Sequence, residues 1–138
     1  MSWKEFEAFS HRIFESSGFE TRKNFRLRKP SAEIDILAIR VDFAFAIDCK
    51  HWKRTVGNAS MTKIAERQIA RAMRLLQLGE LQKVAPMILT WRDEMLYLLA
   101  NRVPVVPIRR LPDFLLNYEA SMTPILTISS SDRQQRLL

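Results

Sequence analysis

Residues 33–53 read EIDILAIRVDFAFAIDCKHWK, and this stretch decides which fold the chain can adopt. Two runs within it, residues 33–39 and 43–50, are rich in Ile, Leu, Phe and Ala, which predicts two buried strands. Val41 and Asp42 lie between the runs and predict a turn that joins the strands as a hairpin. Valine followed by aspartate is poor turn chemistry, so a longer turn or a bulge stays open as an alternative.

Two acidic residues, Asp35 and Asp48, interrupt these apolar strands. A carboxylate in such a position must be exposed at the rim of the sheet, paired, or bound to a cation. A turn centred between Val41 and Asp42 would set the two acids opposite each other, with their Cβ atoms about 5 Å apart. Two ionised carboxylates at that separation repel by about 3 kcal/mol at an effective dielectric constant of about 20. The pattern therefore predicts a compensating cation, and Mg²⁺ is the natural candidate because it takes oxygen ligands.

Lys50 lies two residues after Asp48, so its side chain projects from the same face of the strand. Its ammonium could hold or activate a water, or neutralise a phosphate. Cys49 points to the opposite face and is better interpreted as a core residue, although its backbone carbonyl could supply a metal ligand. The competing interpretation is a structural ion-pair cluster at the rim of the sheet. Asp35, Asp48 and Lys50 without a metal would keep a net negative charge, which favours the metal site.

The rest of the chain supplies the other elements of an α/β domain. We expect helices over residues 2–17, 60–78, 93–102 and 111–118, and strands over residues 19–29, 84–91, 103–108 and 124–128. The two prolines in residues 103–108 predict an edge strand. The order is roughly α-β-β-β-α-β-α-β-α, with a mixed central sheet flanked by helices. We expect one domain over residues 1–128, followed by a polar tail over residues 129–138.

The chain carries 22 Lys and Arg against 15 Asp and Glu, a net charge of +7. This balance favours an anionic partner, and nucleic acid is the best candidate. Basic residues upstream of the acids, just after Lys50 and along the helix over residues 60–78 form the predicted contact set: Lys23, Arg26, Arg28, Lys29, Lys53, Arg54, Lys63, Arg67 and Arg71. For any one of them, a solvated surface charge is the competing interpretation.

Several function classes are excluded by composition. Three glycines leave no Gly-rich phosphate loop, which argues against a P-loop or dinucleotide-binding enzyme. No apolar run approaches the length of a bilayer-spanning helix, and the N-terminus lacks the apolar stretch of a secretory signal. Cys49 is the single cysteine, so it cannot form an internal disulfide. We therefore expect a reducing, cytoplasmic location.

The constellation of acids and lysine resembles the PD-(D/E)xK phosphodiesterase superfamily, which has the restriction-endonuclease-like fold. It is most similar to the Mrr-type catalytic domain, whose N-terminal helix, acid and acid-Cys-Lys motif are matched by Phe6-Glu7-Ala8-Phe9, Ile13-Phe14, Gly18-Phe19, Asp35 and Asp48-Cys49-Lys50. The resemblance covers most of residues 3–116. Two features depart from it: Ile34 stands where the family often has proline, and RKPSAE replaces a Gly-rich run before the acid.

The resemblance implies that Asp35 and Asp48 bind metal and that Lys50 assists the attacking water. It also implies that Glu7 reaches the same site as a further metal ligand or water-positioning base, and that Gln68 is an accessory site residue. For Glu7 a solvated helix position competes with this role, and for Gln68 a surface position does. The implied activity is that of a deoxyribonuclease dependent on Mg²⁺ (or Mn²⁺), cutting DNA phosphodiester bonds in restriction, repair or junction cleavage, as a homodimer or with partner proteins.

Two other function classes remain open. The same fold could be a catalytically inert nucleic-acid-binding module that uses its basic face and keeps the acids as a remnant. More weakly, it could be a structural subunit that docks on a larger complex through an exposed apolar patch.

Overall fold

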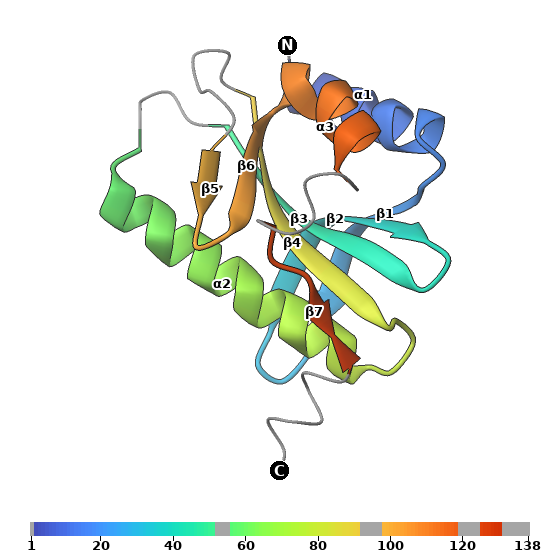
Figure 1. Cartoon of the computed structure of the whole chain (residues 1–138), viewed down its shortest axis with the longest axis vertical. Helices are drawn as coiled ribbons and strands as arrows, with labels where there is room; N and C mark the ends of the chain where they lie inside the picture. Colours follow the sequence, from blue (N-terminus) through green and yellow to red (C-terminus); the bar gives the residue numbers. More distant parts are fainter. Residues whose placement is uncertain (1, 52–55, 92–97, 119–124, 131–138) are drawn as a thin grey trace.

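The computed structural model describes residues 2–51, 56–91, 98–118 and 125–130, which form a mixed seven-stranded sheet with helices on both faces (Figure 1). The elements follow the chain in the order α1 (Trp3–Ser16), β1 (Glu20–Leu27), β2 (Ala32–Arg40), β3 (Phe43–Lys50), α2 (Asn58–Gln77), β4 (Lys83–Thr90), β5 (Leu98–Ala100), β6 (Val103–Pro107), η1 (Ile108–Arg110), α3 (Leu111–Asn117) and β7 (Ile128–Ser129). The predicted fold class, a mixed central sheet flanked by helices, is confirmed.

The hairpin of β2 and β3 has the predicted turn. Arg40 pairs with Phe43, so only Val41 and Asp42 lie between the strands, and the longer turn is not needed. Val41 has a φ of +59° and is 92% exposed. A β-branched residue rarely adopts this left-handed conformation, so the poor turn chemistry seen in the sequence is accommodated as local backbone strain.

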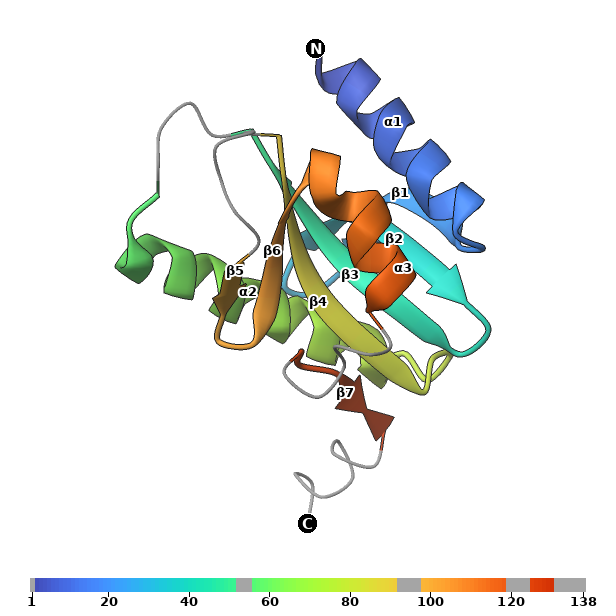
Figure 2. The same ribbon diagram turned by 45° about the horizontal axis from the view of Figure 1, so that its top comes forward.

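The sheet separates two helical layers. β3, α2 and β4 form a parallel crossover, and α2 packs its buried residues against one face of the sheet. α1 and α3 cover the other face (Figure 2), where Phe6 and Phe14 of α1 pack with Phe45 of β3. Side chains alternate between the faces along β3, so Ala46 packs toward α2 and Ile47 toward α1. Asp48 and Lys50 therefore lie on the α2 face.

The hairpin of β1 and β2 changes face partway along its length. Ile36 of β2 packs on the α1 face and Leu37 on the α2 face, as strand alternation requires. Ile34 should share a face with Ile36, but it packs with Leu37 on the α2 face. The change occurs at Asp35, and the facing position on β1 is Asn24, which has a φ of +52°. The end of the hairpin beyond this point, residues 25–34, therefore lies against α2.

Two predictions from the C-terminal half are wrong. Residues 98–100 are not the end of a helix over 93–102 but strand β5, which pairs antiparallel with β6 through a turn at Asn101 and Arg102, both with positive φ. Residues 92–97 lie outside the described residues. β6 is not an edge strand, because it lies between β4 and β5. β6 tolerates Pro104 because its pairing with β4 begins only at Val105.

The chain end that the structure describes is held to the sheet. β7 pairs antiparallel with the start of β4, and the Ser130 N–H donates to the Gln82 carbonyl at 3.0 Å. The predicted division at residue 129 stays a prediction, since residues 131–138 lie outside the described residues. None of the helices in the described ranges has the length and apolar character to cross a bilayer.

Candidate functional site

Two carboxyl groups meet where β2 and β3 stop pairing. Ile36 and Ile47 are the last regular pair, and the same register carried one residue further sets Asp35 opposite Asp48. Beyond that pair, the Cys49 N–H donates to Asp35 Oδ2 at 2.8 Å. The Asp35 side chain thus accepts the hydrogen bond from β3 at the point where the regular ladder ends.

Asp35 titrates far from the range of an ordinary aspartate. Burial, reinforced by a hydrogen bond with Asp48 and by the charge of Asp48, raises the pKa of Asp35 to about 7, although the Cys49 N–H acts in the opposite direction. Two carboxyl groups in contact, one buried and one half-buried, need a shared proton or a cation between them. The sequence prediction that the two acids converge agrees with this geometry.

Two cations stand beside Asp48, which is only 7% exposed. Lys50 Nζ lies 3.3 Å from Asp48 Oδ2, and Arg71 Nη1 of α2 lies 3.9 Å from the same oxygen. The sequence placed Arg71 in the nucleic-acid contact set rather than in the site. With Arg71 included, the two ionised acids and two bases sum to zero charge, so the excess negative charge expected from Asp35, Asp48 and Lys50 alone is offset.

Gln68 lies in the interior, not on the surface. It is fully buried; its Nε2 donates to the Ala46 carbonyl at 2.8 Å, and its Oε1 accepts from Arg71 Nη1 at 3.1 Å. Ala46 stands opposite Pro86 of β4, which has no N–H to donate to the ladder. Gln68 therefore ties α2 to β3 and orients Arg71 toward Asp48. The signal in the sequence is that Gln68 falls in the apolar stripe of α2, three residues after Ala65 and four before Ala72.

Glu7 does not join the two acids in one cluster. It is half-buried on α1, and its charge, with those of Asp35 and Asp48, adds to the burial that raises the pKa of the Cys49 thiol, while Lys50 lowers it. Across the ranges that the structure describes, no three His, Cys, Asp or Glu side chains converge to hold a metal. Cys49 is buried among core residues, as the sequence predicted for its side chain.

The donor set can nevertheless accept a divalent cation. Asp35 and Asp48 offer carboxylate oxygens that already contact each other, and Mg²⁺ binds through one or two carboxylates while keeping several waters. A cation between these oxygens would replace the proton that the elevated pKa of Asp35 reports. The residues present therefore fit such an ion.

A stack of four rings lies next to the site and was missed in the sequence. His51, directly after Lys50, stacks on Trp91 with a centroid distance of 3.8 Å. Trp91 stacks on Phe6 at 5.6 Å, and Phe6 on Trp3 at 5.4 Å. The stack joins the end of β3 to α1 and so fixes the helix that carries Glu7.

Thr90 is a further residue near the site that the sequence analysis did not single out. It stands opposite Lys50 in the parallel register of β3 and β4. Its hydroxyl is buried and has no hydrogen-bond partner among the described residues. A buried polar group of this kind is unusual and marks a position where a bound water or substrate atom would be stabilised.

The predicted nucleic-acid contacts are spread over β1, the β1–β2 turn and α2. Lys23 and Arg26 lie exposed on β1, Arg28 and Lys29 in the turn, and Lys63 and Arg67 exposed on α2. Only Arg71 of the described members contacts the acids. Lys53 and Arg54 lie outside the described residues.

Comparison with known families gives the match that decides the relationship. The profile of the Mrr catalytic domain family, described as "Restriction endonuclease", matches residues 1–84, more than half of the chain. The chain belongs to this family. The matched range contains every member of the site so far described on α1, β2, β3 and α2. Membership of the Mrr family indicates a domain of the restriction-endonuclease type.

A solved structure is also similar to this Mrr-family chain. It is described as "Crystal Structure of Protein of Unknown Function AF1548", with 28% sequence identity and a TM-score of 0.47. The match covers 62% of this chain and 45% of that one, so this chain spans less than half of that protein. No curated protein matches the chain.

Proposed function

We propose that this chain is a divalent-metal-dependent endonuclease that hydrolyses phosphodiester bonds in DNA. The observation that carries the proposal is the contact between the Asp35 and Asp48 carboxyl groups, with Lys50 Nζ 3.3 Å from Asp48, inside the segment that matches the Mrr family. Paired acids with a neighbouring lysine are suited to hold an ion and to orient a water beside a phosphate.

Asp35 and Asp48 would hold Mg²⁺ or Mn²⁺, with the Cys49 carbonyl as an additional oxygen ligand. The bound ion would polarise a phosphate oxygen and lower the pKa of a coordinated water. Lys50, whose side chain is 33% exposed, would hold the attacking water by a hydrogen bond and neutralise charge on the phosphate. Glu7 would position water from α1, since its charge acts on Cys49, which lies between Asp48 and Lys50 in the chain.

Gln68 and Arg71 would support the reaction from α2. Gln68 holds the Arg71 guanidinium, and because the Arg71 side chain is 28% exposed, a phosphate oxygen that entered the site could reach it. Gln68 does not reach solvent, so we assign it a positioning role rather than contact with the substrate.

The proposal also covers the location, the oligomeric state and the domain bounds of the protein. We propose a cytoplasmic enzyme that acts as a homodimer, so that two sites cut two strands, with the nuclease domain over residues 1–128. Restriction, repair and junction cleavage are all compatible with the same scaffold.

The test uses plasmid, branched and single-stranded DNA, with Mg²⁺, with Mn²⁺ and with chelator. We expect cleavage by the wild type with metal and none with chelator. Asp48→Asn should abolish cleavage and retain DNA binding. Asp42→Asn is the matched control, because Asp42 is an exposed residue of the same hairpin. Equal cleavage by wild type and Asp48→Asn would exclude the assigned site.

A specific observation also favours a second candidate, an inert nucleic-acid-binding module. Lys50 and Arg71 both pair with Asp48, and no cluster of three ligating side chains is present in the described ranges. Such an acid pair is balanced without a metal. DNA binding that is independent of metal, with no nicking of any of these substrates, would select this candidate over the nuclease.

A further inference from the structure

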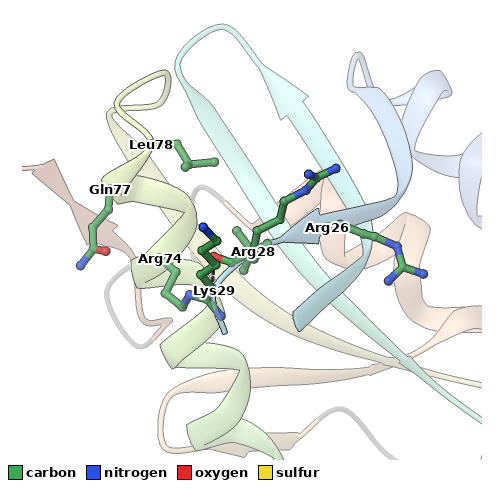
Figure 3. A pocket seen from close by; sticks show the side chains of 7 residues that line it. Arg26, Arg28, Lys29, Arg74, Gln77 and Leu78 are labelled. Atoms are coloured by element: carbon green, nitrogen blue, oxygen red, sulfur yellow. Dashed lines mark hydrogen bonds between the residues drawn. The ribbon is translucent and has the colours of Figure 1, made fainter. Parts of the chain in front are cut away.

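A basic cavity lies one helical turn away from the acids. It has a volume of about 540 Å³ and is formed between the end of β1, the β1–β2 turn and the C-terminal half of α2 (Figure 3). Its lining residues are Arg26, Leu27, Arg28, Lys29, Arg74, Gln77 and Leu78. No carboxylate is among these lining residues, so the cavity presents positive charge.

Three of the four lining cations are available to an anion. Arg26 lies 3.8 Å from Glu33 and points away from the others in Figure 3. Within residues 2–51, 56–91, 98–118 and 125–130, no carboxylate pairs with Arg28, Lys29 or Arg74. A group of like charges held in one cavity favours an anionic ligand.

The cavity is held in shape by its own residues. Arg74 Nη2 donates to the carbonyls of Arg28 at 3.2 Å and of Pro30 at 2.6 Å. These two residues flank Lys29, so the turn is tied to α2 with Lys29 next to Arg74 (Figure 3). The arrangement is therefore preformed, and binding would not have to order the turn.

The cavity continues a line of charge that begins at the acids. Arg71, beside Asp48, and Arg74 are three residues apart on α2 and so share one side of the helix, with Cβ atoms about 5–6 Å apart. At about 1.5 Å per residue, the lining residues Arg74 and Gln77 lie about 5 and about 9 Å beyond Arg71 along the helix axis. One DNA strand carries a phosphate about every 3.4 Å of its axis, so on a strand that ran parallel to α2 this span would correspond to about two to three nucleotides.

We infer that this cavity binds the phosphodiester backbone of the DNA strand about two to three nucleotides from the bond held at Asp35 and Asp48. The inference rests on the proposed function for the position of the scissile bond. Arg28 and Lys29 would contact the phosphates, and Arg74 would hold the turn and add its charge. Such contacts fix the register of the strand without reading its sequence.

The test measures DNA binding in chelator, where no cleavage occurs. A labelled duplex is titrated by fluorescence anisotropy between about 50 and 200 mM salt, and the slope of log K against log salt is compared among variants. Arg28→Gln with Lys29→Gln removes two cavity charges and leaves Arg74 to hold the turn. Arg12→Gln with Lys83→Gln is the matched control, since both residues are exposed and neither lines the cavity. Melting temperatures confirm that both variants fold.

We expect the slope to fall by about 1 to 2 in the cavity variant, because each lost phosphate contact contributes about 0.9, and to change little in the control. A methylphosphonate two to three nucleotides from the cut should weaken binding by the wild type but not by the cavity variant. Equal slopes for the two double variants would overturn the inference. Tight pyrophosphate binding lost in the cavity variant, with unchanged DNA binding, would also overturn it, because it would identify a small-anion site.

Cleavage is measured separately, so the two proposals can fail separately. If the wild type nicks DNA and the two variants have equal slopes, the cavity is not a DNA contact, and the proposed nuclease activity still holds. A reduced slope in the cavity variant, with no nicking by the wild type under any metal condition, would support the cavity as a DNA contact and reject the nuclease.

Discussion

Arg71 Nη1 lies 3.9 Å from Asp48 Oδ2, so a cation carried by α2 stands beside the acid that β3 presents. The two residues are far apart in the sequence and meet because α2 packs across the face of the sheet on which Asp48 lies. Gln68 connects them, since it donates to the Ala46 carbonyl of β3 and accepts from Arg71. Arg71 therefore stabilises ionised Asp48 in the absence of metal, and it competes with any cation that approaches the same oxygen.

This competition predicts that Arg71→Gln binds metal more tightly than the wild type. A partly exposed ion pair contributes up to about 1 kcal/mol, which corresponds to about a fivefold change in affinity. We expect Mn²⁺ titration without DNA to show this gain, and DNA cleavage by the same variant to fall. Arg67→Gln, one turn earlier and exposed on α2, should leave Mn²⁺ affinity unchanged. Unchanged or weaker Mn²⁺ affinity in Arg71→Gln would contradict the competition.

Gln68→Met should destabilise the protein by about 1–3 kcal/mol. Methionine has a similar volume but cannot donate, so the Ala46 carbonyl loses its bond from Gln68 Nε2 in the interior. Urea unfolding measures the change. Gln77→Met, at an exposed position of the same helix, should change the free energy of unfolding by less than about 0.5 kcal/mol. Equal stability of the two variants would show that the buried amide has no such role.

Asp35 makes the metal-free protein less stable as the pH rises. Its pKa is about 7 in the folded state against an ordinary value of 3.8, so the folded state holds the proton more tightly than the unfolded state. The contribution is fully present below about pH 4 and is lost as the pH rises through about 7. Asp35→Asn cannot ionise and can still accept from Cys49, so its stability relative to the wild type should increase between about pH 5 and about pH 8.

Urea unfolding in chelator at the two pH values measures this difference, with Asp42→Asn as the control at an exposed position. A stability difference between Asp35→Asn and the wild type that is the same at both pH values would show that the pKa of Asp35 is not raised.

The turn at Val41 predicts a stabilising substitution. Val41→Gly removes the Cβ that opposes a φ of +59°, and because Val41 is 92% exposed the change sacrifices little packing. We expect a gain of about 1 kcal/mol and an increase in Tm of about 3 °C, measured by thermal unfolding. Val41→Ala keeps the Cβ and should change Tm much less. A lower Tm for Val41→Gly than for Val41→Ala would contradict this account.

The sequence predicted the part of the fold where local signals agree. The alternation of apolar residues and the position of Val41 and Asp42 were sufficient to set the register of β2 and β3, and with it the approach of Asp35 to Asp48. The family match covers this same segment. The catalytic and metal-binding roles of these residues stay predictions.

The predictions from the sequence were wrong or incomplete where tertiary packing determines the conformation or the position of a residue. The charges of residues 93–102 suggested a helix, but Asn101 and Arg102 form a tight turn that pairs Ala100 with Val103. Arg71 was grouped with surface cations because its contact with Asp48 depends on how α2 crosses the sheet. For Gln68 the sequence left a surface position open beside an accessory site role, because a polar residue in an apolar stripe is buried only when it finds partners. Those partners lie on β3 and one turn along α2.

The face change at Asn24 and Asp35 limits how this hairpin can vary in length. A residue added to the turn between β1 and β2 would lengthen the loop and leave Asp35 in phase with Asp48. A residue removed between Asp35 and Arg40 would instead shift Asp35 and every earlier position of β2 by one relative to β3, and so turn the acid away from its partner. Insertions and deletions should therefore be tolerated in the turn between β1 and β2, and they should not be tolerated in residues 35–40, which set the pairing with β3.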